Sequence, residues 1–270
     1  MTKRLRGLLN FLKTIFIYRA VIKAMAVREI QSRYIGTFGG FIWAILQPLT
    51  MIFVYWFVFS VGFKTKPAGG VPYIVVFLCG MIPWSMFAEA LNASTNAINA
   101  NSQLVTKTIF PTEILPVVSL VSALFTHAVM LAIFIVIMLF NKIPFSFYNF
   151  QAIYYLFGMF LFSLGLGWFL SAVNVFYKDV GPTLNVALNV WFWFTPIVWL
   201  QDILPHRFLF IIKLNPIYYI VDGYKASFIY HSPIWHNPAN GLYFWGICVI
   251  VFLAGAATFK RLKPEFAEVL

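Results

Sequence analysis

Charged side chains are scarce in this chain of 270 residues. Asp, Glu, Lys and Arg together make up 10% of it, whereas soluble domains carry about 25%. Hydrophobic residues make up 61%, and no charge interrupts the sequence between Arg33 and Lys64. At roughly 1.5 Å per helical residue, that stretch exceeds the ~30 Å hydrocarbon core of a bilayer. The composition therefore excludes an ordinary soluble domain and predicts an all-α integral membrane protein.

Cysteine is also rare, with Cys79 and Cys248 as the two examples. Both lie inside apolar blocks, which favours buried thiols over a disulfide or a metal site. The phosphate-binding loop G-x-x-x-x-G-K-[ST] is absent, so this chain alone is not expected to hydrolyse ATP. No pattern in the sequence points to a catalytic residue, a bound cofactor or a metal on this chain.

Acidic residues number eight, and none lies deep inside an apolar block. Glu89, Glu113 and Asp179 stand at block edges, which disfavours an ion-coupled carrier because such carriers usually need an ionisable relay within the membrane. A membrane glycosyltransferase is disfavoured because few acids fall in the outer segments. His127 is near the middle of a block, and we interpret it as a hydrogen-bonded structural residue rather than a transport residue.

Long apolar blocks dominate the chain instead. Pro48 in the first block and Pro196 in the fifth predict a kink or hinge in each, because proline removes a backbone donor. The transmembrane domain is expected to cover residues 35–260, after a cytoplasmic amphipathic interface segment, 1–34, and before a cytoplasmic tail, 261–270. The six predicted transmembrane helices cover about 35–63, 71–89, 114–140, 153–176, 180–200 and 242–259.

Lysine and arginine are unevenly distributed along the chain. Over residues 3–17, leucines and isoleucines recur at three- and four-residue spacing with cations opposite, which predicts an amphipathic helix on an anionic lipid surface. Six spans place both termini on one side, and that side holds most of the cations. The positive-inside bias then puts both termini in the cytoplasm. This topology explains the net charge of +11 without nucleic acid as a partner.

Aromatic residues make up 20% of the chain and crowd the first and fifth blocks. Aromatic belts at the bilayer interface explain some of these rings, but not so many at mixed depths. Flat rings suit the apolar faces of sugars, and the hydroxyl and indole groups of these rings are able to bond sugar hydroxyls. A sugar-lined path and ordinary packing against lipid or core both stay open. The candidates for such a path are Trp43, Tyr55, Trp56, Trp191, Trp193 and Phe194.

Several motifs carry a family resemblance. They are residues 28–34 (REIQSRY) leading into 43–48 (WAILQP), 104–116 (LVTKTIFPTEILP), 177–180 (YKDV) and 214–219 (LNPIYY). In this order, and over nearly the whole chain, they resemble type-2 ABC exporter permeases. Within that superfamily the chain is most similar to the polysaccharide-export branch, which moves O-antigen, capsule or teichoic-acid chains. Lys178 stands where the family often has Arg, which keeps the charge but loses bidentate geometry.

The resemblance implies a homodimer in the bacterial plasma (inner) membrane that carries two separate ATP-binding cassette subunits, which hold the ATP and Mg. The substrate would be a lipid-linked polysaccharide. The N-terminal helix and segment 92–113 would face the ATPase, and segment 201–241 would form short re-entrant helices between the fifth and sixth spans that cap the outer exit. Candidate coupling residues are Arg28, Arg33, Lys107, Lys178 and Asp179. Candidate outer-gate residues are Asn215, Pro216, Tyr218 and Tyr219.

Two other functions stay open. One is a type-2 exporter of a small lipid or drug. In that case, cells that lack the chain would not accumulate a lipid-linked glycan. A membrane enzyme acting on lipid-linked glycans would work without any ATPase.

Overall fold

Helices account for all regular secondary structure in the residues that the computed structural model describes, which are 13–64, 70–108, 110–199 and 205–270. The predicted all-α fold is therefore confirmed, and most of the amphipathic helix expected over 3–17 lies outside the described residues. The α-helices are α2 (Arg19–Tyr34), α3 (Trp43–Trp56), α4 (Tyr73–Ala100), α5 (Ser102–Lys107), α6 (Ile114–Phe140), α7 (Gln151–Phe176), α8 (Val180–Phe194), α9 (His206–Lys213), α10 (Pro216–Lys225), α11 (Pro238–Leu262) and α12 (Phe266–Val269). Shorter 3-10 and π segments are η1 (Gly40–Ile42), η2 (Phe57–Gly62), η4 (Phe147–Phe150), η6 (Ala226–Tyr230), η7 (Ile234–His236) and η8 (Lys263–Glu265).

Five helical stretches in the described residues are long and apolar enough to cross a membrane. They match five of the six predicted blocks, and Pro48 lies inside α3 as expected. Between α8 and α11, where short helices were predicted, lie α9 and α10, both too short to span a bilayer. The five stretches are Gly40–Gly62, Tyr73–Ala100, Ile114–Phe140, Phe147–Phe176 and Pro238–Val269.

The remaining block, 180–200, forms the shorter helix α8 of 15 residues, which ends at Phe194. Such a helix reaches roughly 22 Å, less than the ~30 Å of a hydrocarbon core. It ends there because Thr195 precedes a proline and takes an extended conformation, with φ −102° and ψ 131°. Pro196 thus lies in the turn after the helix, and the prediction of a hinge inside this span is wrong.

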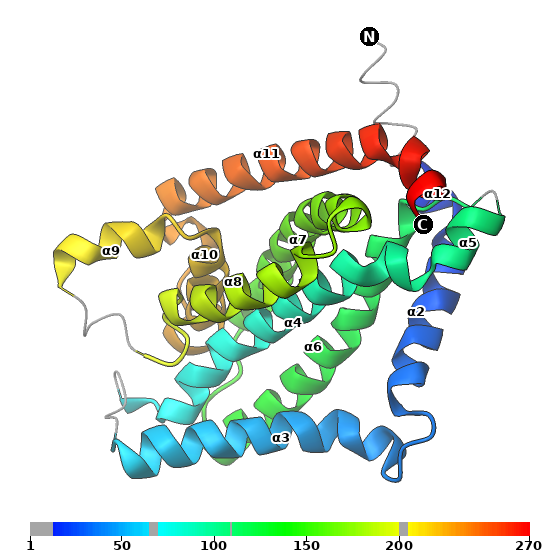
Figure 1. Ribbon diagram of the computed structural model, residues 1–270. Helices are drawn as coiled ribbons and strands as arrows, with labels where there is room; N and C mark the ends of the chain where they lie inside the picture. Colours follow the sequence, from blue (N-terminus) through cyan, green and yellow to red (C-terminus); the bar gives the residue numbers. More distant parts are fainter. Residues whose placement is uncertain (1–12, 65–69, 109, 200–204) are drawn as a thin grey trace.

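Both ends of the described chain lie at the same end of the molecule, which we name the terminal end (Figure 1). There α2 lies beside α6, and α12 contacts α5 and α7. Phe266 of α12 packs against Phe176 at the end of α7, with ring centroids 6.2 Å apart. The opposite end carries α9 and the first turn of α4, and we name it the α9 end (Figure 1).

Helix α8 connects these two ends although it is short. Gly181 in its first turn lies next to the side chains of Asn96 and Asn174, near the terminal end. Four residues after the helix ends, the carbonyl of Val198 accepts a hydrogen bond from the hydroxyl of Tyr73 at 2.6 Å. Because Tyr73 begins α4, the segment 181–198 runs antiparallel to most of α4.

Helix α4 forms the centre of the bundle. It packs against α6, α7, α8 and α10, and most of its side chains are buried. Both cysteines of the chain, Cys79 on α4 and Cys248 on α11, are buried and free, as expected. Helix α3 instead lies along the outside (Figure 1), with Ala44 and Ile52 as its buried residues. It therefore presents a long apolar surface to lipid or to another protein chain.

The polar segment 92–113, expected to be a cytoplasmic loop, is largely helical. Helix α4 continues past Glu89 to Ala100, and α5 follows it. Polar side chains of this segment hydrogen-bond to carbonyls four residues earlier, such as Thr95 to Leu91 at 2.7 Å. These bonds satisfy the polar groups inside the helix, so Thr95 is fully buried despite its hydroxyl. A polar sequence therefore does not end the helix here.

Helices α7 and α11 pack with their backbones in direct contact. A Cβ atom built on Gly255 of α11 would overlap the carbonyl of Gly165 on α7. A Cβ atom on Gly165 would lie 2.7 Å from the Cα atom of Phe252. Small residues that let two backbones touch are a common basis of helix packing in membranes.

We expect Gly255→Ala to lower the apparent melting temperature of the purified protein, because its methyl group must push α7 and α11 apart. Gly246→Ala on the same helix is the matched control, since a Cβ atom there meets nothing within 4 Å. Alanine is favoured over glycine in a helix by about 1 kcal/mol, so the control should be neutral or stabilising. Equal melting temperatures for the two variants would contradict this close packing.

Candidate functional site

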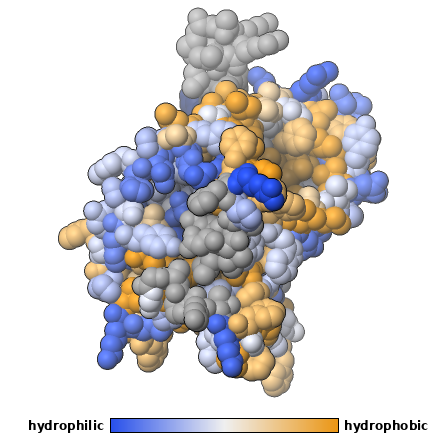
Figure 2. Space-filling model, turned by 90° about the vertical axis from the view of Figure 1, so that its left-hand side faces the viewer, coloured by the Kyte–Doolittle hydropathy of each residue, from blue (hydrophilic) through white to orange (hydrophobic). Residues whose placement is uncertain are grey.

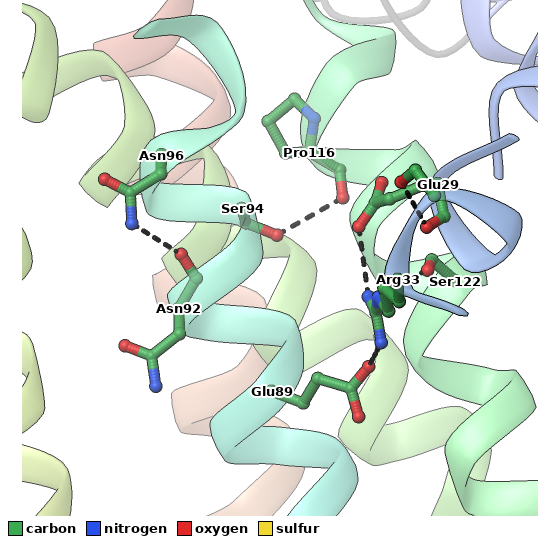
Figure 3. Close-up of polar contacts among 9 residues, drawn as sticks. Glu29, Arg33, Glu89, Asn92, Ser94, Asn96, Pro116 and Ser122 are labelled. Carbon is green, nitrogen blue, oxygen red and sulfur yellow. Dashed lines mark hydrogen bonds and ion pairs between the residues drawn. The ribbon is translucent and has the colours of Figure 1, made fainter. Parts of the chain in front are cut away.

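Arg33, near the end of α2, joins three helices at the terminal end (Figure 3). Its guanidinium forms ion pairs with Glu29, one turn earlier, at 3.1 Å and with Glu89 of α4. It also donates a hydrogen bond to the hydroxyl of Ser122 on α6 at 2.9 Å. The two carboxylates carry more negative charge than the one guanidinium carries positive charge, so the cluster as a whole does not attract an anion.

A cavity of about 580 Å³ lies beside this cluster, between the α2–α3 connection, α4 and α6. The rings of Trp43 and Tyr34 form part of its wall, and Gln47, Arg33 and Glu89 supply donors and acceptors. Its size is typical of small-molecule sites. Ring faces combined with hydrogen-bonding groups suit a polyhydroxylated molecule such as a sugar. We refer to it as the inner cavity.

The six aromatic candidates for a path fall into two groups. Tyr55 and Trp191 pack inside the chain: Tyr55 stacks on Phe77 of α4 with centroids 4.8 Å apart, and Trp191 stands edge-on to Phe87 at 5.2 Å. The other four are 39–61% exposed and are able to face lipid, a second chain or a substrate. These four are Trp43, Trp56, Trp193 and Phe194.

An apolar hollow of about 370 Å³ lies between the end of α8 and α9. Trp193 and Phe194 form its α8 side, and the indole of Trp199 is held there by donating to the carbonyl of Trp193 at 3.0 Å. The hollow offers ring faces without the polar groups of the inner cavity. Trp43 thus lies on the inner cavity and Trp193 and Phe194 on this hollow, whereas Trp56 lines neither.

Asn215 connects α8 to α10 at the α9 end. Its side-chain carbonyl accepts from the indole of Trp191 at 2.7 Å and from the backbone amide of Ile217 at 3.0 Å, which caps α10. Its amide donates to the hydroxyl of Thr195 at 2.8 Å. Pro216 occupies the first turn of α10, where its missing N–H costs nothing. The Asn-Pro motif therefore has a clear structural role at this junction.

The other two outer-gate candidates, Tyr218 and Tyr219, are buried at the α9 end. The hydroxyl of Tyr219 lies 3.3 Å from that of Tyr154 on α7, which accepts from the indole of Trp245 at 2.6 Å. His127 is also buried, and its Nε2 lies 3.2 Å from the hydroxyl of Tyr224. This contact agrees with the structural role expected for His127.

The coupling candidates divide in a similar way. Arg33 is bound internally, whereas Arg28, Lys107, Lys178 and Asp179 are exposed and form no ion pair within the part of the chain that the structure describes. Lys107 ends α5, and Lys178 and Asp179 lie in the turn between α7 and α8. These four side chains are free to meet another protein.

The described residues contain no cluster of His, Cys, Asp or Glu able to hold a metal ion. A comparison with known protein families assigns the fold: the family described as ABC-2 type transporter matches residues 20–229. The chain belongs to this family. Its members are transporter permeases, so the cavities and exposed rings above are surfaces of a transport protein rather than an active site.

Curated relatives of this permease are similar to it over three quarters of its length or more. An O-antigen export system permease protein RfbA of Klebsiella pneumoniae is 26% identical over 90% of this chain and 92% of the relative. A protein of the same name from Myxococcus xanthus is 26% identical over 97% of this chain and 99% of the relative. The polysialic acid transport protein KpsM of Escherichia coli is 23% identical over 76% of this chain and 80% of the relative.

Two polar contacts of the permease were not among the sequence candidates. Asn174 on α7 donates to the carbonyl of Thr95 at 2.9 Å and binds α7 to α4. Glu113, almost fully buried, pairs with Lys263 at 2.5 Å and holds the C-terminal segment against the start of α6. Asn174 carried a usable signal, because an amide at the end of an apolar block usually needs a partner on another helix. Glu113 and Lys263 are too far apart in sequence to be paired by spacing.

We expect Arg33→Gln to lower the apparent melting temperature of the purified permease, because Glu89 is then left largely buried without its counter-charge, at a cost of roughly 1–3 kcal/mol. Arg28→Gln, exposed on the same helix, is the control and should melt like the parent. Adding Glu89→Gln to Arg33→Gln should recover part of the loss. If the Arg28 and Arg33 variants melt alike, the cluster does not hold α2 to the bundle.

Proposed function

We propose that this chain is the permease subunit of an ABC exporter that moves a lipid-linked polysaccharide from the cytoplasm across the bacterial plasma membrane. The observation that carries the proposal is the similarity, over 90% and 97% of the chain, to permeases named for O-antigen export, together with a match over 76% of the chain to a protein named for polysialic acid transport. The inner cavity supports it, since rings and hydrogen-bonding groups of this kind suit sugars. The proposal does not require any single residue of the cavity to bind the polymer tightly.

We infer that the chain crosses the membrane six times with both termini in the cytoplasm. Helices α2 and α12 share the terminal end, so the chain between them crosses the bundle an even number of times. Five long helices and α8 together provide six crossings. Polar groups at the end of α8 are bonded to neighbouring helices, which makes a short crossing acceptable in lipid. Helices α9 and α10 then form the re-entrant elements at the outer face.

We infer that the working unit is a homodimer with two ATP-binding cassette subunits, which supply ATP and Mg. The exposed apolar faces of α3 and α8 offer a surface for the second copy, and the exposed aromatic candidates would line a path between the two copies. Arg28, Lys107, Lys178 and Asp179 are exposed on the terminal end and form no ion pair with another described residue, and a cytoplasmic ATPase would dock there. Movement of the turn at Lys178 and Asp179 would then be transmitted to α8.

We expect cells without this chain to accumulate lipid-linked polysaccharide in the cytoplasmic leaflet and to lose it from the surface. Reintroducing the parent gene should restore export. Trp43→Ala should restore it only partly, because it removes a ring from the inner cavity and leaves the packed core intact. Surface polysaccharide and intracellular lipid-linked glycan, measured per permease molecule in the membrane, decide the result.

Tyr148→Ala is a matched control, since it removes an exposed ring outside the inner cavity. No accumulation in cells without the chain would rule out polysaccharide export. Export at the parental rate by the Trp43 variant would instead show that the inner cavity is not part of the path, without contradicting polysaccharide export.

The topology predicts which positions a membrane-impermeant thiol reagent reaches in intact cells. Lys142→Cys, in the turn between α6 and α7, should be labelled from outside, and Lys107→Cys should be labelled only after the cells are opened. The native Cys79 and Cys248 are buried, so the parent chain should give little background. Labelling of Lys107→Cys in intact cells would overturn the orientation.

A further inference from the structure

A second polar cavity lies at the α9 end, separate from the inner cavity and from the apolar hollow. It measures about 530 Å³ and lies between α9, α10, the segment after η6 and the start of α11. Figure 2 looks onto this end and shows hydrophilic residues gathered on one side of it. We name it the outer pocket. Its polar and aromatic wall includes Tyr155, Tyr218, Tyr219, Tyr230, Asp222 and Asn240.

The tyrosine wall of the outer pocket is held in place before any ligand binds. Tyr219 is fixed through its hydroxyl contact with Tyr154, and it stacks on Phe244 of α11 with centroids 5.0 Å apart. Tyr155 packs directly over Gly223, where any Cβ atom would collide with the phenol ring. The ring therefore reaches the pocket only because residue 223 is a glycine. Preorganised rings lose little entropy when a ligand stacks on them.

Asp222 is the one carboxylate among the described residues that line this wall. Among the described residues no salt bridge involves Asp222, whose side chain is half-buried. Burial raises the pKa of Asp222, while the more distant charges of Lys225 and Lys213 oppose that rise. The carboxylate opens onto the pocket as an acceptor, and a ligand carrying O–H groups would donate to it in place of water.

We propose that the outer pocket binds a short segment of carbohydrate, with Asp222 accepting hydrogen bonds from sugar hydroxyls and Tyr230 offering its exposed ring face. This inference rests on the proposed function, which makes the exported polymer the available saccharide on this side. A phosphate is disfavoured because the pocket carries a carboxylate. A bare divalent cation is disfavoured because Lys213 and His236 face the same space. Asn237 and Asn240 add amide groups that bond hydroxyls equally well.

The test uses the purified full-length permease in detergent and saturation-transfer NMR. The probe is a set of short oligosaccharides cut from the surface polysaccharide of the same strain, with dextran oligosaccharides as an unrelated saccharide. Asp222→Asn keeps the shape and removes the charge, and Tyr230→Ala removes the exposed ring. Tyr148→Ala is the matched control, because it removes an exposed ring at the same end without touching the pocket. Melting curves check that each variant is folded.

We expect the strain's oligosaccharides to bind the parent and the Tyr148 variant alike, and to bind the Asp222 and Tyr230 variants at least about fivefold more weakly. Weaker binding of dextran would assign the pocket to the exported polymer, and equal binding would assign it to saccharides in general. No binding to the parent, or parental binding by both pocket variants, overturns the inference. Should Asp222→Asn fail to fold, Tyr230→Ala decides alone. Failure of the proposed function would appear separately, as absent glycan accumulation in cells without the chain.

Discussion

The carbonyl groups of the segment just after α8 must find hydrogen-bond donors away from bulk water, and the arrangement of the α9 end depends on this constraint. A buried carbonyl without a donor costs about 1–3 kcal/mol. Pro196 prevents the helix from continuing, so its own turns cannot supply the donors. Lys225 of α10 donates to the carbonyl of Pro196 at 2.8 Å, and Tyr73 of α4 donates to that of Val198. The positions of α10 and of the start of α4 follow from these bonds.

The same bonds make α8 a stiff connection between the two ends of the bundle. Its first turn lies beside Asn174 and directly follows the exposed pair Lys178 and Asp179. Its last turn is held by Asn215, which also caps α10. One helix and one side chain therefore connect the terminal end to α10. Helix α3 has no comparable polar attachment at its far end among the described contacts, so it is able to move more independently.

The sequence was sufficient to predict the all-α fold because the evidence lay in the absence of charge over long stretches. The end of α8 was predicted wrongly, at residue 200, because the apolar residues beyond Pro196 hid the boundary that the Thr195-Pro196 step sets. The helical nature of 92–100 was hidden by its polar composition. Its amides and hydroxyls bond within the helix, and composition alone does not reveal whether such bonds form.

The candidate site was harder to predict than the fold because the direction of each ring depends on helix rotation. Trp43 and Tyr55 lie on the same helix, yet one faces a cavity and the other packs on Phe77. That difference is set by the side chains of α4, far away in sequence. Arg33 and Glu89 posed a similar problem, since nothing in the spacing of two residues on different helices indicates that they form a pair.

The charges of the two polar cavities fit a path for a neutral polymer. The chain carries a net charge of +11, yet the inner cavity is lined by one cation and one anion, Arg33 and Glu89. Among the described residues that line it, the outer pocket likewise has one lysine, Lys213, and one carboxylate, Asp222. Most cations lie elsewhere, on surfaces that meet lipid headgroups or other proteins. Cavities with balanced charge and several rings give many weak contacts and no strong one, and a polymer that must advance one sugar at a time needs contacts that break easily.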